Sequence, residues 1–253
     1  MSRTFFIICF TIYTISSFAQ SKGKNTFSAL LIHVNYGFQI PAADLTTRFG
    51  NNFSIGGGID YLSERDNWII GLKGSNIFSR NVKEDVLTSL RDRDGFIIGN
   101  SDAGAGSYAL VVLRERGFHL GGHIGKLFAL SKKNKRSGIR ATLGIGLLQH
   151  KIRIQDESGI AKAIANEYVK GYDQLSNGLA LEQFIGYQHL SIHRGFNFFA
   201  GFEFIEGFTQ SRRSFNFVTQ SRDTTKRVDV LMGFRLGWTI SFYIGEKGED
   251  LIY

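Results

Sequence analysis

The chain has 253 residues, with 30 basic and 22 acidic side chains and a formal net charge of +8. It contains 23 Phe and 30 Gly but a single Pro and a single cysteine, Cys9, so a fold held together by internal disulfides is excluded. No long apolar run follows residue 15, which excludes a protein that crosses a membrane with several helices.

Residues 1–19 are predicted to be a cleaved signal peptide. Arg3 precedes the apolar run FFIICFTIYTI at 5–15, and Ser17 and Ala19 occupy the minus-three and minus-one positions of a cleavage site. The run is shorter than the roughly 20 residues that a membrane-spanning helix needs. Residues 20–26 would then form a periplasmic N-terminal segment, and the exported chain would be stabilised by packing or by a membrane, without disulfides.

Alternation of apolar and polar residues predicts strands along the rest of the chain. The first covers 29–40, where Leu30, Ile32 and Val34 begin a series of even-numbered apolar positions, and Pro41 is expected to end it. The strands that follow are predicted at 53–63, 67–79, 107–130, 139–155, 177–191, 196–210 and 227–244.

The last of these stretches decides the fold class. Large apolar side chains occupy every even position of 230–244, whereas Asp229, Gly233 and Arg235 lie at odd positions. A face of eight side chains exceeds the about 5 to 6 residues of a typical soluble strand and suits a tilted membrane strand of about 9 to 11 residues. We therefore predict an all-β protein, a transmembrane antiparallel up-and-down β-barrel of eight strands.

The connections between the predicted strands alternate in length. Those at 64–67, 131–138 and 192–195 are short, and those at 41–52, 79–105, 155–176 and 211–227 are long. Membrane barrels place short turns in the periplasm and long loops outside. The barrel is thus expected over 27–245, with a short periplasmic tail at 246–253 and both termini periplasmic. Within one long loop, Ile160, Ile164 and Val169 have helical spacing, which predicts a short helix at 160–169 that packs over the barrel mouth or against another protein.

Arg235, Gly237, Ile240 and Phe242 fit the polar-x-Gly-x-x-apolar-x-apolar pattern that ends many membrane barrels. With this motif and its strand pattern, the chain resembles small outer-membrane β-barrels of the OmpA/OmpX type. The resemblance implies the outer membrane of a Gram-negative bacterium and contact with the barrel-assembly machinery during insertion. It implies no particular activity.

Strand parity directs a set of charged side chains into the lumen. The interior of an eight-stranded barrel is just wide enough for side chains to fill it, and an unpaired buried charge costs several kcal/mol. We therefore predict a plug of ion pairs rather than a pore. Parity also places Gln183 on the lipid face unless a bulge moves it. The predicted lumen network consists of Asp60, Lys73, Arg140, Glu182, Glu203 and Arg235.

Catalytic and metal sites have weak support in the sequence. His33, Ser54 and Glu182 could be assembled from separate strands, but no spacing requires it. His119 and His123 share a strand face at roughly 13 Å, which is too far to share a metal. The lumen side chains are interpreted as structural, and no catalytic residue, metal or cofactor is predicted.

The loop at 211–227 is the candidate binding surface. It carries Arg212, Arg213, Arg222, Lys226 and Arg227 but a single acid, so it could bind outer-membrane lipid, including the anionic groups of lipopolysaccharide, or an acidic partner. A solvated loop without a ligand is the alternative. Nucleic acid is set aside because the charge is spread over the loops of an exported protein.

Three functions are consistent with these features. The preferred hypothesis is a non-enzymatic structural or interaction protein, or an accessory subunit of a larger secretion or assembly complex of the cell envelope. The alternative is a lipid-modifying enzyme of the lipid A deacylase or acyltransferase kind, and the third is a narrow channel.

Overall fold

The computed structural model describes residues 28–100, 106–191 and 195–244. The predicted signal peptide, the N-terminal segment at 20–26 and the tail at 246–253 lie outside the described residues.

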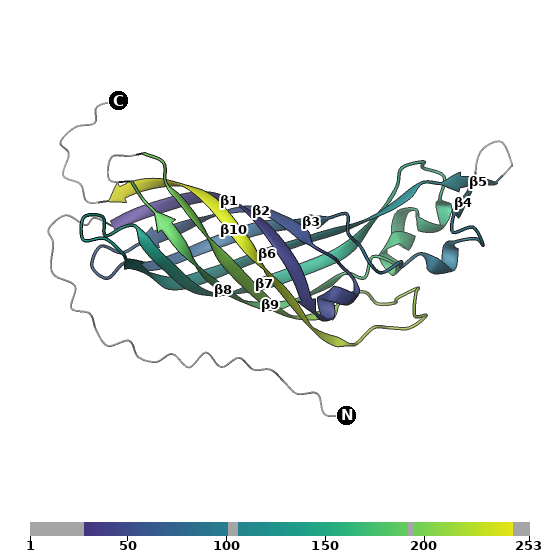
Figure 1. Cartoon of the computed structure of the whole chain (residues 1–253). Helices are drawn as coiled ribbons and strands as arrows, with labels where there is room; N and C mark the ends of the chain where they lie inside the picture. Colours follow the sequence, from purple (N-terminus) through teal and green to yellow (C-terminus); the bar gives the residue numbers. More distant parts are fainter. Residues whose placement is uncertain (1–27, 101–105, 192–194, 245–253) are drawn as a thin grey trace.

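Eight antiparallel strands close into a barrel, as predicted (Figure 1). Around the ring, β1 pairs with β10 and with β2, and the order is β1-β10-β9-β8-β7-β6-β3-β2. The strands are β1 (Ser28–Ala43), β2 (Asn52–Leu62), β3 (Trp68–Ser79), β6 (Val111–Ala129), β7 (Gly138–Asp156), β8 (Ser176–His189), β9 (Phe198–Ser211) and β10 (Lys226–Ile244).

The register shows how strongly the strands are tilted. Paired residues followed from Phe38 through β2, β3 and β6 lead to Lys151 on β7. Followed the other way, through β10, β9 and β8, they lead to Ala141 on the same strand. The barrel therefore has a shear of 151 − 141, or 10 residues, over its eight strands. Closure with such a stagger requires strands tilted by about 35–45° from the barrel axis.

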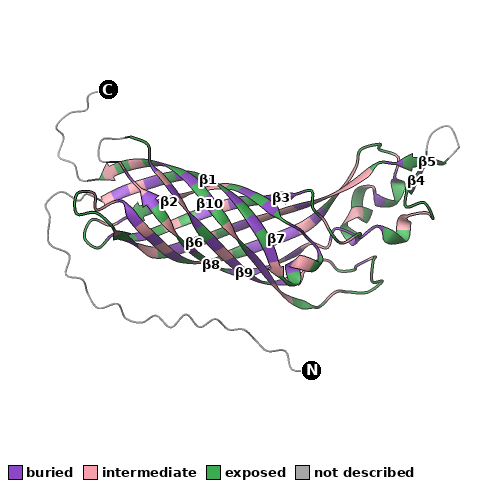
Figure 2. Cartoon of the chain, in the orientation of Figure 1, coloured by how far each residue is buried: buried purple, intermediate pink, exposed green. Residues whose placement is uncertain are grey.

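Burial alternates along each strand because one face fills the lumen and the other faces out (Figure 2). On β10, Phe234 and Leu236 are 45% and 51% exposed, whereas the intervening Arg235 is 2% exposed. Large apolar side chains are exposed in the same way on the other barrel strands. A continuous apolar surface of this size is unfavourable in water and is the lipid-facing band of a membrane barrel. No helix among the described residues is long and apolar enough to cross a bilayer.

The long loops pack together at one end of the barrel into a cap, defined here as the described residues 44–51, 80–100, 106–110, 157–175 and 212–225. It contains the two-stranded sheet β4 (Ile97–Asn100) and β5 (Gly106–Ala109) and four 3-10 helices, η1 (Asp44–Thr47), η2 (Thr88–Leu90), η3 (Lys162–Ile164) and η4 (Asn166–Gly171). Its buried apolar side chains, among them Leu87, Ile97 and Ile164, form one cluster with Leu148 and Ile205 of the lumen. The loops are thus a packed body continuous with the barrel interior.

Several predicted boundaries were wrong. Pro41 does not end β1, which continues to Ala43. Beyond Gln39 the strand pairs with β10 only, so a residue without an N–H is tolerated there. The predicted strand at 107–130 is interrupted at Leu110, where β5 ends and β6 begins, and the preceding loop contains β4.

The helix expected near 160–169 is instead two short 3-10 helices, η3 and η4. They are separated at Ala165, which is extended, and η4 begins at Asn166, whose φ of 52° is not that of a continuing helix. On β8, no bulge moves Gln183. It lies in register opposite Leu143 and Phe204 with its side chain facing outward.

Candidate functional site

The lumen holds a first cluster of charged groups around Asp60, whose side chain is 0% exposed. Arg140 Nη1 lies 2.8 Å from Asp60 Oδ2, and His123 Nε2 lies 2.9 Å from Asp60 Oδ1. His33 Nδ1 approaches the same carboxylate at 3.5 Å, and Arg140 also donates to Gln188 Oε1 at 3.1 Å. Side chains from three strands, β1, β6 and β7, therefore contact the buried carboxylate of Asp60, which lies on β2.

A second cluster joins Lys73, Glu182, Glu203 and Arg235. Lys73 Nζ lies 2.6 Å from Glu182 Oε1 and also forms an ion pair with Glu203. Arg235 Nη1 lies 2.6 Å from Glu203 and 3.4 Å from Glu182. The cluster is formally neutral because it contains two cations and two carboxylates. All four side chains are buried at 2–4% exposure.

Aromatic rings pack beside both clusters. Phe184 and Phe199 meet edge to face with 5.7 Å between their centroids. The Arg235 guanidinium lies 4.4 Å from the Phe184 centroid, and that of Arg140 lies 5.3 Å from the Phe199 centroid. A Cβ on the neighbouring Gly237 would overlap the Phe199 ring, so this position admits only glycine without rearrangement.

Apolar residues fill the lumen at the end where the short turns lie. They form a separate buried cluster of Ala29, Leu31, Leu62, Ile69, Leu127 and Leu190. From this end, the described interior passes from apolar packing to the ion-paired clusters and then to the apolar base of the cap. The six residues of the predicted lumen network all lie inside the barrel at 0–5% exposure, but in two groups: Asp60 pairs with Arg140, and the other four form the second cluster.

A third cluster, at the cap end of the lumen, could not be found from strand parity because one member comes from a loop. Arg48, which follows η1, lies 3.4 Å from Asp229 Oδ1 and donates to Ser176 at 3.2 Å. His150 Nε2 lies 2.7 Å from Asp229 Oδ2, and the Thr209 hydroxyl donates to that same oxygen. A hydroxyl, an imidazole and a carboxylate are also the three groups of a catalytic triad, but here their arrangement differs.

In a triad the hydroxyl faces the imidazole that takes its proton. Here Thr209 and His150 both bind the carboxylate of Asp229, and all three residues are at most 2% exposed. His33, considered above with Ser54 and Glu182, instead contacts Asp60. Among the described residues, no group of three or more His, Cys, Asp or Glu side chains could hold a metal ion.

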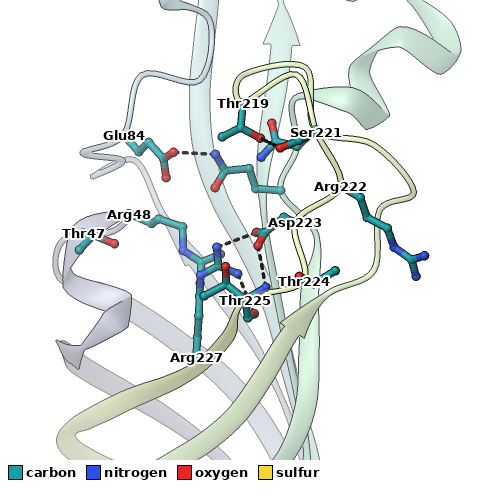
Figure 3. A pocket seen from close by; sticks show the side chains of 12 residues that line it. Thr47, Arg48, Glu84, Thr219, Ser221, Arg222, Asp223, Thr224, Thr225 and Arg227 are labelled. Atoms are coloured by element: carbon teal, nitrogen blue, oxygen red, sulfur yellow. Dashed lines mark hydrogen bonds and ion pairs between the residues drawn. The ribbon is translucent and has the colours of Figure 1, made fainter. Parts of the chain in front are cut away.

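The cap contains a polar pocket of about 560 Å³ between the β1–β2 loop and the loop that precedes β10 (Figure 3). Arg48, Glu84, Arg222, Asp223 and Arg227 line it, together with several hydroxyl and amide side chains. Arg227 Nη2 lies 2.6 Å from Asp223 Oδ2. Figure 3 shows the Arg222 side chain extending away from this pair, so its charge is available at the pocket rim.

The five bases of the candidate loop have different surroundings. Arg222 and Arg227 line the pocket. Arg213 forms an ion pair with Asp173 in the cap, and Arg212 donates to Asn177 Oδ1 at the end of β8. Lys226 is exposed at the start of β10. Sequence reasoning missed Arg48 and Glu84, which reach the pocket from other loops.

A second feature of the cap is the outer face of the β4–β5 sheet. Phe96, Ile98, Tyr108 and Leu110 project from it and are 49%, 58%, 59% and 61% exposed. Ile98 pairs with Tyr108, and the Phe96 and Tyr108 ring centroids lie 4.6 Å apart. The alternate residues, Ile97 and Ala109, are buried in the cap core. Figure 1 places this sheet at the tip of the molecule, beyond the barrel.

The closed ring of eight tilted strands, its outward apolar band and its interior of paired polar groups define a small outer-membrane β-barrel. The protein therefore belongs to the outer membrane of a Gram-negative bacterium. Its four long connections face outside and its three short turns face the periplasm.

The sequence matches no protein-family model and has no significant match among curated proteins. Its structure is similar to that of Ail, the attachment invasion locus protein of Yersinia pestis, in complex with the heparin analogue sucrose octasulfate. That match has 12% identity and a TM-score of 0.41, and it covers 85% of this chain and 99% of that one. Neisserial surface protein A matches at 10% identity and a TM-score of 0.42, over 85% and 99% of the two chains. OprG of Pseudomonas aeruginosa matches at 13% and 0.38, over 88% and 99%.

Proposed function

We propose that this barrel is a non-enzymatic, non-conducting interaction protein whose cap docks a partner protein, as an accessory subunit of a larger cell-envelope complex. The observation that carries the proposal is the apolar outer face of the β4–β5 sheet. In this proposal the ion-paired lumen supports the cap, whose core is continuous with the barrel interior. The partner binds the outer face of the β4–β5 sheet, outside the cell.

The β4–β5 face has the composition of a protein interface. Two aromatic and two aliphatic side chains lie together on it, each about half exposed or more. Aromatic residues are enriched in the energetic centres of interfaces, and apolar patches rimmed by polar residues mark sites of association. Lipid does not cover this face, because the sheet lies beyond the outward band of the barrel (Figure 1).

Site-specific photo-crosslinking in intact cells tests the docking proposal. A photoreactive residue at Ile98 should give one dominant crosslinked protein, identified by mass spectrometry. The same residue at Tyr168, which is 63% exposed elsewhere on the cap, is the matched control. Ile98→Asp should abolish recovery of that protein with the barrel while leaving barrel assembly intact. Equal crosslinking from both positions, or recovery unaffected by Ile98→Asp, would refute the proposal.

The cap pocket favours a second function, binding of an anionic saccharide. Of the three arginines that line the pocket, Arg48 pairs with Asp229 and Arg227 pairs with Asp223, whereas Arg222 extends away from these pairs at the pocket rim (Figure 3). Guanidinium groups bind sulfate and phosphate bidentately. Titration with a sulfated disaccharide should give binding that Arg222→Gln weakens and that Lys162→Gln, an exposed base outside the pocket, leaves unchanged. Equal binding by both variants would remove this function.

The enzymatic and channel alternatives make different predictions. A lipid-modifying enzyme requires a reachable nucleophile or metal, whereas the Thr209, His150 and Asp229 side chains are buried, and Thr209 and His150 both bind the Asp229 carboxylate. Surface lipid from cells with and without the protein should therefore have the same mass.

For the final strand, we propose that Ile240 and Phe242, which both face outward, form the assembly signal with Arg235 and Gly237. Phe242→Ser should slow insertion without changing the folded barrel.

A further inference from the structure

A basic patch lies on the outer wall of the barrel, away from the cap pocket and from the β4–β5 sheet. On β6, the outward side chains change from Leu120 and Phe118 to Arg116 and Arg114. On β7, they change from Ile145 and Leu147 through Gln149 to Lys151 and Arg153. The change occurs where the apolar band ends, which is the level of lipid headgroups in the outer leaflet.

The four cations face one another in a way that is unfavourable without a counterion. Arg116 is paired directly with Lys151 across the two strands, and Arg114 is paired with Arg153. Like charges at directly opposed positions on one face of a sheet destabilise it. Within the described part of the chain, one carboxylate forms an ion pair with this group, Glu157 with Arg114 at 3.4 Å. The Glu115 carboxylate does not pair with these bases, because it points into the lumen, where Glu115 is 1% exposed and accepts a hydrogen bond from Asn52; its main-chain carbonyl accepts a hydrogen bond from Arg116 at 2.8 Å.

The wall is hollowed beside these cations. A hollow of about 520 Å³ is lined by Asn76, Phe78, Arg116, Phe118, Gln149 and Lys151. Phe78 is paired with Arg116, and Phe118 is paired with both Asn76 and Gln149, so two rings and two amides lie next to the bases. Gln149 Oε1 accepts a hydrogen bond from Asn177 at 3.3 Å, and Gln149 is one of the residues that line the hollow.

We propose that this hollow binds a phosphate-bearing lipid headgroup of the outer leaflet, with Arg116 and Lys151 holding the phosphate and Arg114 and Arg153 adding attraction. The rings of Phe78 and Phe118 contact the first acyl segments, and the Asn76 and Gln149 amides bind headgroup hydroxyls. The proposal goes beyond the docking function, since it concerns the barrel wall and does not involve the cap. Three features together indicate a lipid headgroup as the ligand of the hollow: the paired cations bind phosphate, the site lies at the edge of the lipid-facing band, and the rings of Phe78 and Phe118 line it.

Binding of defined lipids to the purified full-length barrel in a non-ionic detergent tests the site. The probes are lipid A with two phosphates, lipid A with one phosphate, and inorganic phosphate. Titration followed by native mass spectrometry should rank them in that order. Because one base near a membrane surface contributes roughly fivefold to the binding constant, Arg116→Gln and Lys151→Gln should each weaken bisphosphorylated lipid A by about fivefold, and together by about 25-fold. Lys132→Gln, in the periplasmic turn, is the matched control and should have no effect.

A stability measurement separates ligand binding from a structural role. In detergent without lipid A, Arg116→Gln and Lys151→Gln should be as stable as the wild type or more stable, because each relieves a like-charge pair. With lipid A present, the wild type should gain more stability than either variant.

Three results would overturn the proposal. The first is undiminished lipid A binding by the double variant. The second is a loss of stability in both single variants when no lipid is present, which would make the cations structural. The third is inorganic phosphate displacing lipid A at equal concentration, which would make the hollow a site for free anions.

Discussion

Replacement of Lys73 by Met is the sharpest test of the ion-paired lumen. The substitution keeps most of the side-chain volume and removes the ammonium that lies 2.6 Å from Glu182 and also pairs with Glu203. Two carboxylates would then share Arg235 as their remaining cation in this cluster. The four groups are at most 4% exposed, so water cannot replace the missing charge.

The magnitude follows from this geometry. Breaking a buried ion pair by removal of one partner costs about 3–5 kcal/mol, because the other charge is left uncompensated. In Lys73→Met/Glu182→Gln, one positive and one negative charge are lost together, and the pair of Arg235 with Glu203, at 2.6 Å, remains. The double variant should therefore recover most of the loss, which is the opposite of two additive defects.

Equilibrium urea unfolding of the purified barrel in lipid vesicles, followed by tryptophan fluorescence, gives the free energy of unfolding for each protein. Lys132→Met, at an exposed base in the short turn between β6 and β7, controls for loss of a lysine without loss of a buried pair. A change below about 1 kcal/mol in Lys73→Met, or a double variant that is less stable than the single one, would refute the reasoning on paired charges.

Three further predictions follow from other parts of the molecule. Gly237→Ala should lower the free energy of unfolding by about 1–3 kcal/mol, since the added Cβ overlaps the Phe199 ring, whereas Gly122→Ala, on the outer face with an ordinary contact, should change it little. At Asp223, partial burial opposes ionisation, but the Thr225 amide and neighbouring groups outweigh it and hold the pKa of the carboxyl below its ordinary value of 3.8. The contribution of Asp223 to loop order is therefore present above pH 3.8 and lost as the pH falls through the lowered pKa, so the Thr225 amide should exchange hydrogen faster at pH 2 than at pH 6 after correction for its intrinsic rate. In planar bilayers, the wild-type barrel should show no discrete conductance.

Each of these has a contrary outcome. Equal stability of the two glycine variants would mean that Phe199 moves aside at no cost. Uniform protection of the Thr225 amide down to pH 2 would mean that the carboxylate of Asp223 does not order the loop. Single-channel steps in the wild type would contradict a closed lumen, and their appearance only in Lys73→Met would instead support the clusters as its seal.

The barrel itself could be predicted from the sequence because two-residue periodicity is a local property. In a closed sheet each strand has one lipid-facing and one lumen-facing side, so the apolar series on β10 and the loop lengths carry the information directly. Parity likewise directs Asp60 and Lys73 inward. Strand boundaries were less predictable. Pro41 remains in β1 because β2 begins at Asn52, opposite Gln39, and so leaves Pro41 paired with β10 alone. This boundary therefore depends on the extent of a different strand.

The candidate surfaces depended on tertiary structure. Arg48 reaches Asp229 across 181 positions of the sequence, and no periodicity relates a loop residue to a strand residue. The basic patch arises from register, since Arg116 meets Lys151 only when β6 and β7 pair as they do. The sequence by itself determined which side of each strand meets lipid, because that follows from the chemistry of neighbouring residues. Which charges meet was decided by the shear of the closed barrel, because closure sets the height at which each strand presents its side chains.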